Sequence, residues 1–249
     1  MSKLFDLTGK AALITGGNGG IGLGIAQGFA EAGAKVLIVG RDRAKNEAAA
    51  ELVGGAHFQA DLTDEAQCRA AVAEAERLFG RLDILVNNAG TNIRMRPEEL
   101  GAEDWHKVID TNLTSAHLMC QAAHPLLKRQ GGKVINIGSM MSIFGVPFSP
   151  AYAASKGGVV QYTKVLATAW AADDIQANAI LPGWIDTELT RGARRQVDGL
   201  HDRVLARTPA ARWGEPRDMA GVAVFLAAPA SDFVTGTAIP ADGGYSALG

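Results

Sequence analysis

Short apolar runs alternate with longer segments of helical periodicity along most of the chain. The runs show no regular exchange of apolar and polar residues, so both faces of each predicted strand are expected to be covered by helices. Strands covered in this way, with a helix between one strand and the next, form a parallel sheet. The alternation therefore predicts an α/β, doubly wound fold with a seven-stranded parallel sheet flanked by helices. Strands are expected at 11–15, 35–39, 57–60, 82–87, 133–137, 175–180 and 237–241, and helices at 20–31, 42–53, 64–79, 103–130 and 151–172.

The 249 residues are predicted to form a single domain, residues 1–249. A chain of this length can bury roughly three quarters of its unfolded surface around one core. No internal repeat, low-complexity tract or Pro/Ser-rich linker divides it. The least regular segment, 183–214, is charged and punctuated by Gly and Pro, which favours a lid over a substrate rather than a domain boundary.

Composition excludes several classes of partner. The net charge of −2 and the scattered Lys and Arg residues give no basic field for nucleic acid. No run approaches 18 uninterrupted apolar residues and the N-terminus has no apolar leader, so neither a membrane nor a secretion route is expected. Two cysteines, Cys68 and Cys120, cannot make a disulfide framework and are expected to be buried hydrophobic residues in a reducing, cytoplasmic setting.

The stretch TGGNGGIG, residues 15–22, holds five glycines in eight positions between the first predicted strand and the first predicted helix. Glycine allows positive φ and close approach of the backbone to a ligand. The N-terminus of the helix that follows would offer unpaired N–H groups and a positive dipole end to a pyrophosphate. Two registers compete from this stretch alone. Gly17, Gly19 and Gly22 satisfy G-x-G-x-x-G, and Thr15, Gly16, Gly20 and Gly22 satisfy T-G-x-x-x-G-x-G.

The rest of the chain favours the second register. In order come NNAG at 87–90, Asn112, Ser139, YAASK at 152–156 and PG at 182–183. With the glycine stretch, this series resembles the motifs of the short-chain dehydrogenase/reductase family over the whole chain. The resemblance implies a doubly wound Rossmann-type fold, a nicotinamide dinucleotide and a homotetramer that pairs through the helices of 103–130 and 151–172. The cofactor residues that it implies are Thr15, Gly16, Asn18, Gly20, Ile21, Gly22, Arg41, Asp61, Leu62, Asn88, Ala89, Gly90, Tyr152, Lys156, Pro182, Gly183, Ile185 and Thr187.

The choice between NADP and NAD depends on the end of the second predicted strand, which reads VGRD. An acid there would bond both ribose hydroxyls and repel a 2′-phosphate. By analogy with the family, that acid should align at Gly40, and Arg41 stands where NADP-preferring members often carry a base. NADP is therefore expected, with NAD as the alternative if Arg41 only begins a solvated helix and Asp42 caps it or reaches the ribose.

Four residues are predicted to be catalytic. Tyr152 and Lys156 are four residues apart in a predicted helix, so their side chains lie on one face, and an ammonium close to a phenol favours the phenolate. Ser139 follows a strand at the carboxyl edge of the sheet, where its hydroxyl can orient a carbonyl oxygen, although a turn serine is the alternative. Asn112 is a polar residue within an apolar helix, and helix capping is its alternative. In the family, the matching asparagine holds a water in a proton relay and the matching lysine also bonds the nicotinamide ribose.

Other chemistries are disfavoured. His106, His117 and His124 are spaced by eleven and seven residues, too far apart to share a metal without other ligands, so no metal is expected. No G-x-S-x-G sequence surrounds any serine, which argues against a hydrolase. The predicted reaction is hydride transfer between nicotinamide and a secondary alcohol or ketone.

The substrate pocket is expected to involve the residues after NNAG, the segment 140–150 and the segment after Gly183. Arginines in two of these segments can meet a carboxylate, or can simply be solvated: Arg94, Arg96, Arg191, Arg194 and Arg195. The arginine-containing loop of this pocket is similar to those of gluconate 5-dehydrogenase and deoxygluconate dehydrogenase members of the family. A sugar acid or polyol is therefore the first expectation for the small-molecule substrate. The alternatives are a 3-oxoacyl thioester reductase and a non-catalytic nucleotide-binding redox sensor.

Overall fold

Seven parallel strands form one sheet in the computed structural model, which describes residues 3–248. Their order is β3-β2-β1-β4-β5-β6-β7, so the chain moves outward from β1 in one direction and then returns to continue from β4 in the other. This order confirms the predicted doubly wound, seven-stranded parallel fold. The strands are β1 (Ala11–Thr15), β2 (Lys35–Gly40), β3 (Ala56–Gln59), β4 (Ile84–Asn87), β5 (Gly132–Ile137), β6 (Ile175–Pro182) and β7 (Ala238–Ala241).

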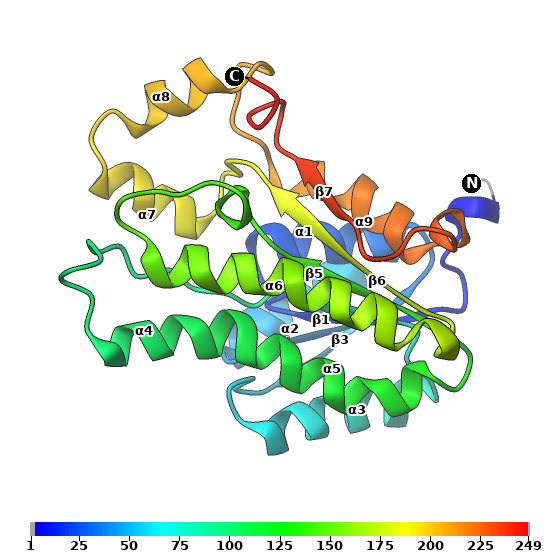
Figure 1. The fold of residues 1–249 in the computed structure, drawn as a ribbon. Coiled ribbons are helices and arrows are strands. Elements are labelled where there is room, and N and C mark those ends of the chain that lie inside the picture. The colour runs from blue at the N-terminus through cyan, green and yellow to red at the C-terminus, as the bar shows by residue number, and fades with distance from the viewer. Residues whose placement is uncertain (1–2, 249) are drawn as a thin grey trace.

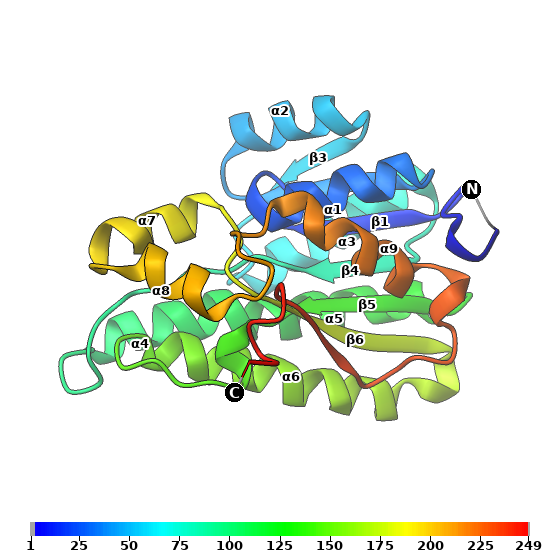
Figure 2. The ribbon, with the colours of Figure 1, turned by 90° about the horizontal axis from the view of Figure 1, so that it is seen from above.

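Helices cover both faces of the sheet (Figures 1 and 2). One face carries α1 (Gly20–Glu31), α2 (Arg43–Val53) and α9 (Ala220–Ala227), and their apolar side chains form one buried cluster with the strands. The other carries α3 (Glu65–Phe79), α5 (Ser115–Leu127) and α6 (Pro150–Ala169), which form a second cluster. Strands buried from both sides explain why the sequence shows apolar runs without alternation.

Two aspartates fix where α2 and α3 begin. The side chain of Asp42 accepts a hydrogen bond from the Lys45 amide, and that of Asp64 accepts from the amides of Ala66 and Gln67. Each is therefore an N-cap, and α2 and α3 begin one residue later than the predicted ranges 42–53 and 64–79. Both helices end at a glycine in the left-handed region, Gly54 and Gly80.

The segment 103–130 is not the single helix that its periodicity predicts. It divides into α4 (Ala102–Ile109), a π-helical turn (Asp110–Thr114) and α5. The turn is centred on Asn112, whose side chain bonds groups outside the helix, so the local widening carries this residue toward the sheet.

The segment 183–214 contains two helices that the sequence did not predict, α7 (Glu188–Gln196) and α8 (Leu200–Arg207). They lie together beyond the carboxyl ends of the strands (Figures 1 and 2). Their apolar residues form a small cluster of their own with Trp184 and Trp213. Helix α9 was also missed. Short 3-10 turns occur at Lys3–Phe5, Met140–Ser142, Ala171–Asp173, Pro216–Met219 and Pro229–Ser231.

Two expectations about composition can be compared with the structure. Cys68 and Cys120 are both buried and unpaired, as predicted. Among the described residues, no helix is both long and apolar enough to cross a membrane.

Candidate active site

The glycine stretch between β1 and α1 adopts a conformation that selects between the two possible registers. Gly16 and Gly20 have φ values of +61° and +49°, a region that favours glycine, whereas Gly17 and Gly19 do not. A Cβ on Gly22 would overlap the carbonyl oxygen of Gly16 and the side-chain amide of Asn88. The positions that require glycine are therefore those of the T-G-x-x-x-G-x-G register.

A second loop is bound to the glycine stretch by hydrogen bonds. The Thr15 hydroxyl accepts from the amides of Asn88 (2.9 Å) and Ala89 (3.1 Å) and donates to the carbonyl of Val86 (3.2 Å). The side-chain amide of Asn88 in turn donates to the carbonyls of Thr15 (3.1 Å) and Gly16 (3.0 Å). These bonds join the carboxyl ends of β1 and β4 into one rigid rim.

A cavity of about 650 Å³ opens along this rim. It is lined by 16 of the 18 predicted cofactor residues, together with Ser139 from the predicted catalytic set. Thr15 and Gly22 do not line it, because they are behind the wall and shape the backbone that does. Gly19, the N-cap of α1, gives no side-chain cap, so amides of the first turn face the cavity without a side-chain partner. Glycines without room for a Cβ and an uncapped helix N-terminus fit a dinucleotide pyrophosphate.

The end of β2 closes one side of this cavity. A Cβ on Gly40 would lie 2.8 Å from both the Asn18 amide nitrogen and the Asn46 amide oxygen, which bond each other at 2.6 Å. Asn46 is itself fixed by bonds to the carbonyls of Gly40 and Phe58, so position 40 has little space for an acidic side chain. Arg41 is exposed and lines the cavity, and its guanidinium has no ion-pair partner within residues 3–248. Asp42 caps α2, as its alternative interpretation predicted.

Tyr152 and Lys156 lie one turn apart on α6 and both line the cavity. The Lys156 ammonium lies 5.8 Å from the centre of the Tyr152 ring and donates to the carbonyl of Ile137 at 2.7 Å. Lys156 is only 4% exposed, and burial lowers its pKa to about 8.

The electrostatics of Tyr152 differ from the expectation. Burial raises the pKa of its phenol, and this is opposed by a hydrogen bond with the Ser139 hydroxyl and by the positive charge of Arg94. Arg94 is thus a second cation near Tyr152, in addition to Lys156, whose ammonium lies over the ring and donates to a strand carbonyl. The sequence analysis offered Arg94 only as a carboxylate ligand or a solvated residue.

Ser139 follows β5 and is held in a tight turn. Its hydroxyl accepts from the Met141 amide at 3.1 Å, while its own amide donates to the Ser142 hydroxyl at 3.2 Å. The Ser142 hydroxyl also donates to the backbone carbonyl of Lys156 at 2.8 Å. Ser142 therefore links the turn that carries Ser139 to the helix that carries Tyr152 and Lys156, a role that the sequence did not indicate.

Asn112 lies behind the cavity wall and is 2% exposed. Its side chain accepts from the Thr91 amide (2.7 Å) and donates to the Thr91 carbonyl (2.9 Å) and to the Ser155 hydroxyl (3.0 Å). It makes no helix cap. A Cβ on Gly90 would be 3.3 Å from the Asn112 amide oxygen and 3.6 Å from the Lys156 ammonium, so both groups lie close to Gly90.

A second cavity, of about 520 Å³, adjoins the first. Ser139 and Tyr152 line both. The second is walled by loop 140–149, by α8 and by the C-terminal segment, and it is lined by Arg94, Arg203 and Arg207. The side-chain oxygen of Asn92 and the indole nitrogen of Trp184 also lie in lining residues, and both are buried without a hydrogen-bond partner among the described residues.

Of the five arginines that the sequence singled out, only Arg94 lines this cavity. Arg96 pairs with Glu98, and Arg191 and Arg194 pair with Asp186. Arg195 is exposed and lines neither cavity. Sequence reasoning missed Arg203 and Arg207, whose spacing of four would have placed them on one face if α8 had been predicted.

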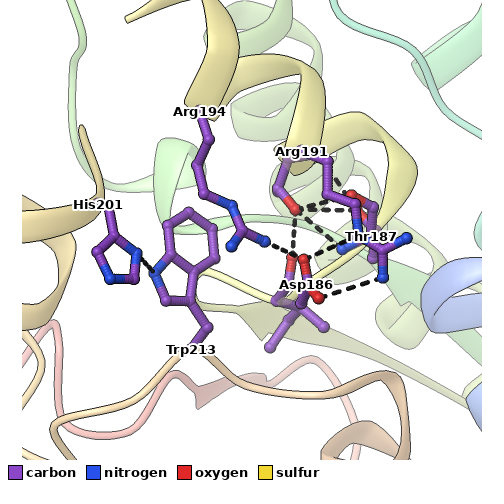
Figure 3. Close-up of polar contacts among 8 residues, drawn as sticks. Asp186, Thr187, Arg191, Arg194, His201 and Trp213 are labelled. Atoms are coloured by element: carbon purple, nitrogen blue, oxygen red, sulfur yellow. Dashed lines mark hydrogen bonds and ion pairs between the residues drawn. The ribbon is translucent and has the colours of Figure 1, made fainter. Parts of the chain in front are cut away.

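Helices α7 and α8 form a roof, defined here as residues 183–214, over the two cavities. Figure 3 shows the contacts that hold the roof. The Asp186 carboxylate forms ion pairs with Arg191 and Arg194, and the Arg194 guanidinium lies 4.1 Å from the centre of the Trp213 ring. The Trp213 indole N–H donates to His201 at 3.0 Å. These contacts join both roof helices to the segment that follows them.

Two of the three histidines weighed as metal ligands form hydrogen bonds with other side chains. His117 bonds Tyr162 and His124 bonds Asp173. Within residues 3–248, His, Cys, Asp and Glu side chains form no group of three or more that could hold a metal ion.

The chain is similar to known proteins over nearly its whole length. A family model described as enoyl-(acyl carrier protein) reductase matches residues 16–246. The 2-dehydro-3-deoxy-D-gluconate 5-dehydrogenase of Bacillus subtilis is 42% identical over 246 residues, which cover 97% of this chain and 96% of that protein. The chain belongs to the short-chain dehydrogenase/reductase family. The predicted family resemblance is confirmed.

Other members of the short-chain dehydrogenase/reductase family are similarly close. The gluconate 5-dehydrogenase of Gluconobacter oxydans is 38% identical over 98% of this chain and 97% of its own length. The crystal structure of a gluconate 5-dehydrogenase from Burkholderia cenocepacia in complex with NADP and tartrate has a TM-score of 0.94 and 40% identity, with 98% of each chain covered. The prediction of an NAD(P)-dependent dehydrogenase/reductase acting on CH–OH groups is confirmed at the level of this class.

Proposed function

We propose that this chain is an NADP-dependent oxidoreductase that interconverts a secondary alcohol and a ketone on a sugar acid. The observation that carries the proposal is that Ser139 and Tyr152 line both cavities. One cavity is shaped by glycines and fits a dinucleotide, and the other is lined by three arginines. Pro182, Gly183, Leu189 and Thr190 also line both, but only Ser139 and Tyr152 among the shared residues belong to the predicted catalytic set, so the reacting centres would meet at these two side chains.

The proposed roles follow from the positions of the side chains. Bound nicotinamide supplies or accepts the hydride. Tyr152 donates a proton to the substrate oxygen from its phenol in reduction and accepts it in oxidation, and Ser139 orients that oxygen through its hydroxyl. Arg94 and the Ser139 hydrogen bond stabilise the phenolate that remains after the proton leaves. Lys156 is proposed to return a proton to Tyr152, with Asn112 holding a water in the relay; both lie near Gly90.

The remaining predicted cofactor residues are proposed to hold the dinucleotide as the family resemblance implies. Preference for NADP is supported by two features of this chain. The Asn18–Asn46 pair occupies the space that an acid at position 40 would need, and the partnerless Arg41 offers a charge for a 2′-phosphate. The NADP held by the Burkholderia cenocepacia relative agrees with this choice.

A sugar acid as substrate is supported by the lining of the second cavity. Three arginines line it, and a guanidinium can bind a carboxylate. The relatives named above act on gluconate or 2-dehydro-3-deoxy-D-gluconate according to their names.

The test is a panel of carbonyl compounds assayed with NADPH and with NADH: 5-keto-D-gluconate, its uncharged analogue L-sorbose, and an acetoacetyl thioester. We expect NADPH oxidation with 5-keto-D-gluconate, and a kcat/KM at least tenfold above that with NADH. Turnover of the thioester alone would favour the 3-oxoacyl reductase alternative. Binding of NADPH without turnover of any compound would favour the redox-sensor alternative.

Three broader features belong to the same proposal. The chain acts as a single domain with the roof as a lid, works in the cytoplasm, and assembles into a homotetramer through α5 and α6. Helix α6 leaves Val165 58% exposed on the face away from the sheet, which supports burial against a second subunit. Light scattering after size-exclusion chromatography measures the assembly directly.

A further inference from the structure

Arg207 lies at the junction of three segments that are far apart in sequence. It ends α8, is half-buried and lines the second cavity together with Ser139 and Tyr152. Its guanidinium carbon lies 4.4 Å from the centre of the Tyr245 ring and 4.9 Å from that of Phe144. The two rings meet edge to face, at 6.3 Å and 71°. Figures 1 and 2 both place the C-terminal segment, which carries Tyr245, beside α8.

The charge of Arg207 is not matched by any acid within residues 3–248. Among the described residues, no carboxylate pairs with it and its guanidinium donates no hydrogen bond. This differs from Arg191, Arg194 and Arg212, each of which pairs with an aspartate. Aromatic faces stabilise a cation but do not satisfy its N–H donors in the plane of the guanidinium. Arg207 is therefore held in place with its donors still available to a ligand.

A guanidinium presents a planar fork of donors that matches a carboxylate in bidentate geometry. Contact with two rings restricts the side chain before a ligand arrives, which reduces the entropy that binding would otherwise cost. We propose that the Arg207 guanidinium binds the substrate carboxylate and thereby selects sugar acids over uncharged ketoses, a proposal that rests on the proposed reaction at Tyr152. The site takes an extended hydroxy acid, with the carboxylate at Arg207 and the reacting carbon at Tyr152.

The other two arginines of the cavity are less suited to this task. Arg94 donates to the Gln196 side chain at 3.1 Å and to the Leu189 carbonyl at 3.3 Å, and its charge acts on Tyr152, so it belongs to the reacting end. Arg203 is exposed and contacts no aromatic ring. Arg207 alone combines partial burial, fixed orientation and unused donors.

The first experiment compares Arg207→Gln and Arg207→Lys with the wild type on 5-keto-D-gluconate and L-sorbose, which differ only in carboxylate against hydroxymethyl. We expect Arg207→Gln to raise KM for 5-keto-D-gluconate about 30-fold, with kcat changed less than threefold and L-sorbose kinetics unchanged. Arg207→Lys keeps the charge without the fork, so it should recover part of the affinity. Arg195→Gln removes an exposed roof charge outside both cavities and should leave both substrates unaffected. An equal rise of KM for both substrates, or no rise, would overturn the proposal.

The second experiment measures binding without turnover, so that a failure of the proposed function can be recognised separately. D-gluconate and D-glucitol are titrated calorimetrically into the wild type and into Arg207→Gln, without cofactor. We expect the wild type to bind D-gluconate at least tenfold more tightly than D-glucitol, and Arg207→Gln to lose that difference. If D-gluconate binding depends on Arg207 but no keto sugar acid is turned over, the proposed function is contradicted while the carboxylate site is supported. Equal binding of both compounds by the wild type would refute the carboxylate site.

Discussion

The floor and the roof of the cavities are built in different ways. The floor, formed by the ends of β1, β4 and β5 with α6, is joined by buried hydrogen bonds such as those of Thr15, Asn88 and Asn112. The roof is held by the partly exposed pairs of Asp186 with Arg191 and Arg194 and by contacts of Trp213. Buried polar networks tolerate little change because each lost partner leaves an unsatisfied group, whereas exposed ion pairs contribute little.

This difference separates chemistry from selectivity. The floor carries every predicted catalytic residue and the glycine cradle, so changing it should remove the reaction or the fold. The roof carries Arg203 and Arg207 and can vary in side chains without disturbing the strands. The same sheet and catalytic residues can then carry out one type of reaction on different substrates when the roof residues change.

The largest effect should come from the floor residue that moves the proton. Tyr152→Phe removes the phenol hydroxyl but keeps the ring, so we expect kcat to fall about 10³-fold, roughly 4 kcal/mol of barrier. NADPH affinity, measured by fluorescence titration, should change less than twofold because the cradle is intact. Retention of a tenth or more of wild-type kcat would remove the proton-transfer role.

The second-largest effect should come from the glycine stretch, residues 15–22. Gly22→Ala forces a Cβ against the Gly16 carbonyl and the Asn88 amide and should lower the free energy of unfolding by about 3 kcal/mol. Gly19→Ala is the matched control, since a Cβ there meets nothing within 4 Å and φ is extended. Urea unfolding measures both. Equal losses in the two variants would contradict the close packing assigned to Gly22.

A third prediction concerns a buried charge in the floor. Burial lowers the pKa of Lys156 from 10.5 to about 8, so the protonated side chain destabilises the fold by about 3 kcal/mol at pH 7. Lys156→Met keeps the chain length and loses one hydrogen bond of about 1 kcal/mol. We therefore expect the variant to be inactive but about 2 kcal/mol more stable at pH 7.

The sign of the pH dependence follows from the same shift. Between pH 8 and 10.5 the unfolded chain binds this proton more readily than the folded one, so wild-type stability gains as pH rises. The advantage of Lys156→Met should therefore shrink across that window, vanish at about pH 10 and reverse above it, where only the lost hydrogen bond remains. Lys164→Met, an exposed lysine on the same helix, should show no such trend. A stability difference that is constant with pH would exclude burial of the ammonium as its cause.

The floor was predictable because its signals are local. The spacing of Tyr152 and Lys156, the glycine stretch after β1 and the polar residues at strand ends all follow from one helix turn or one strand end. The π-helical turn around Asn112 was not predictable, since its geometry depends on Thr91 and Ser155, which approach only in the fold.

The roof escaped prediction for a different reason. Helix α7 reads ELTRGARRQ, which is amphipathic but has a glycine inside and only Leu189 and Ala193 as apolar residues, too few for a recognisable apolar face. Helix α9 reads AGVAVFLA and is apolar on every face, so it shows no amphipathic pattern. The environment of Arg207 depends on Phe144 and Tyr245, which are distant in sequence. Selectivity residues of this kind become visible only when the segments are assembled.

The smallest effect should come from the roof's own ion pairs. Asp186→Asn removes the carboxylate that receives Arg191 and Arg194 (Figure 3), and because these groups are partly exposed we expect less than 1 kcal/mol of lost stability. The loosened roof should raise KM for the substrate two- to fivefold at low salt, and the difference should narrow in 0.5 M salt, where the Debye length is about 4 Å. Asp202→Asn removes the same charge from α8 where the acid has no ion-pair partner among the described residues, so it should not change KM. If Asp186→Asn instead abolished folding, the roof would be as tightly coupled to the strands as the floor, and the separation of chemistry from selectivity would not hold.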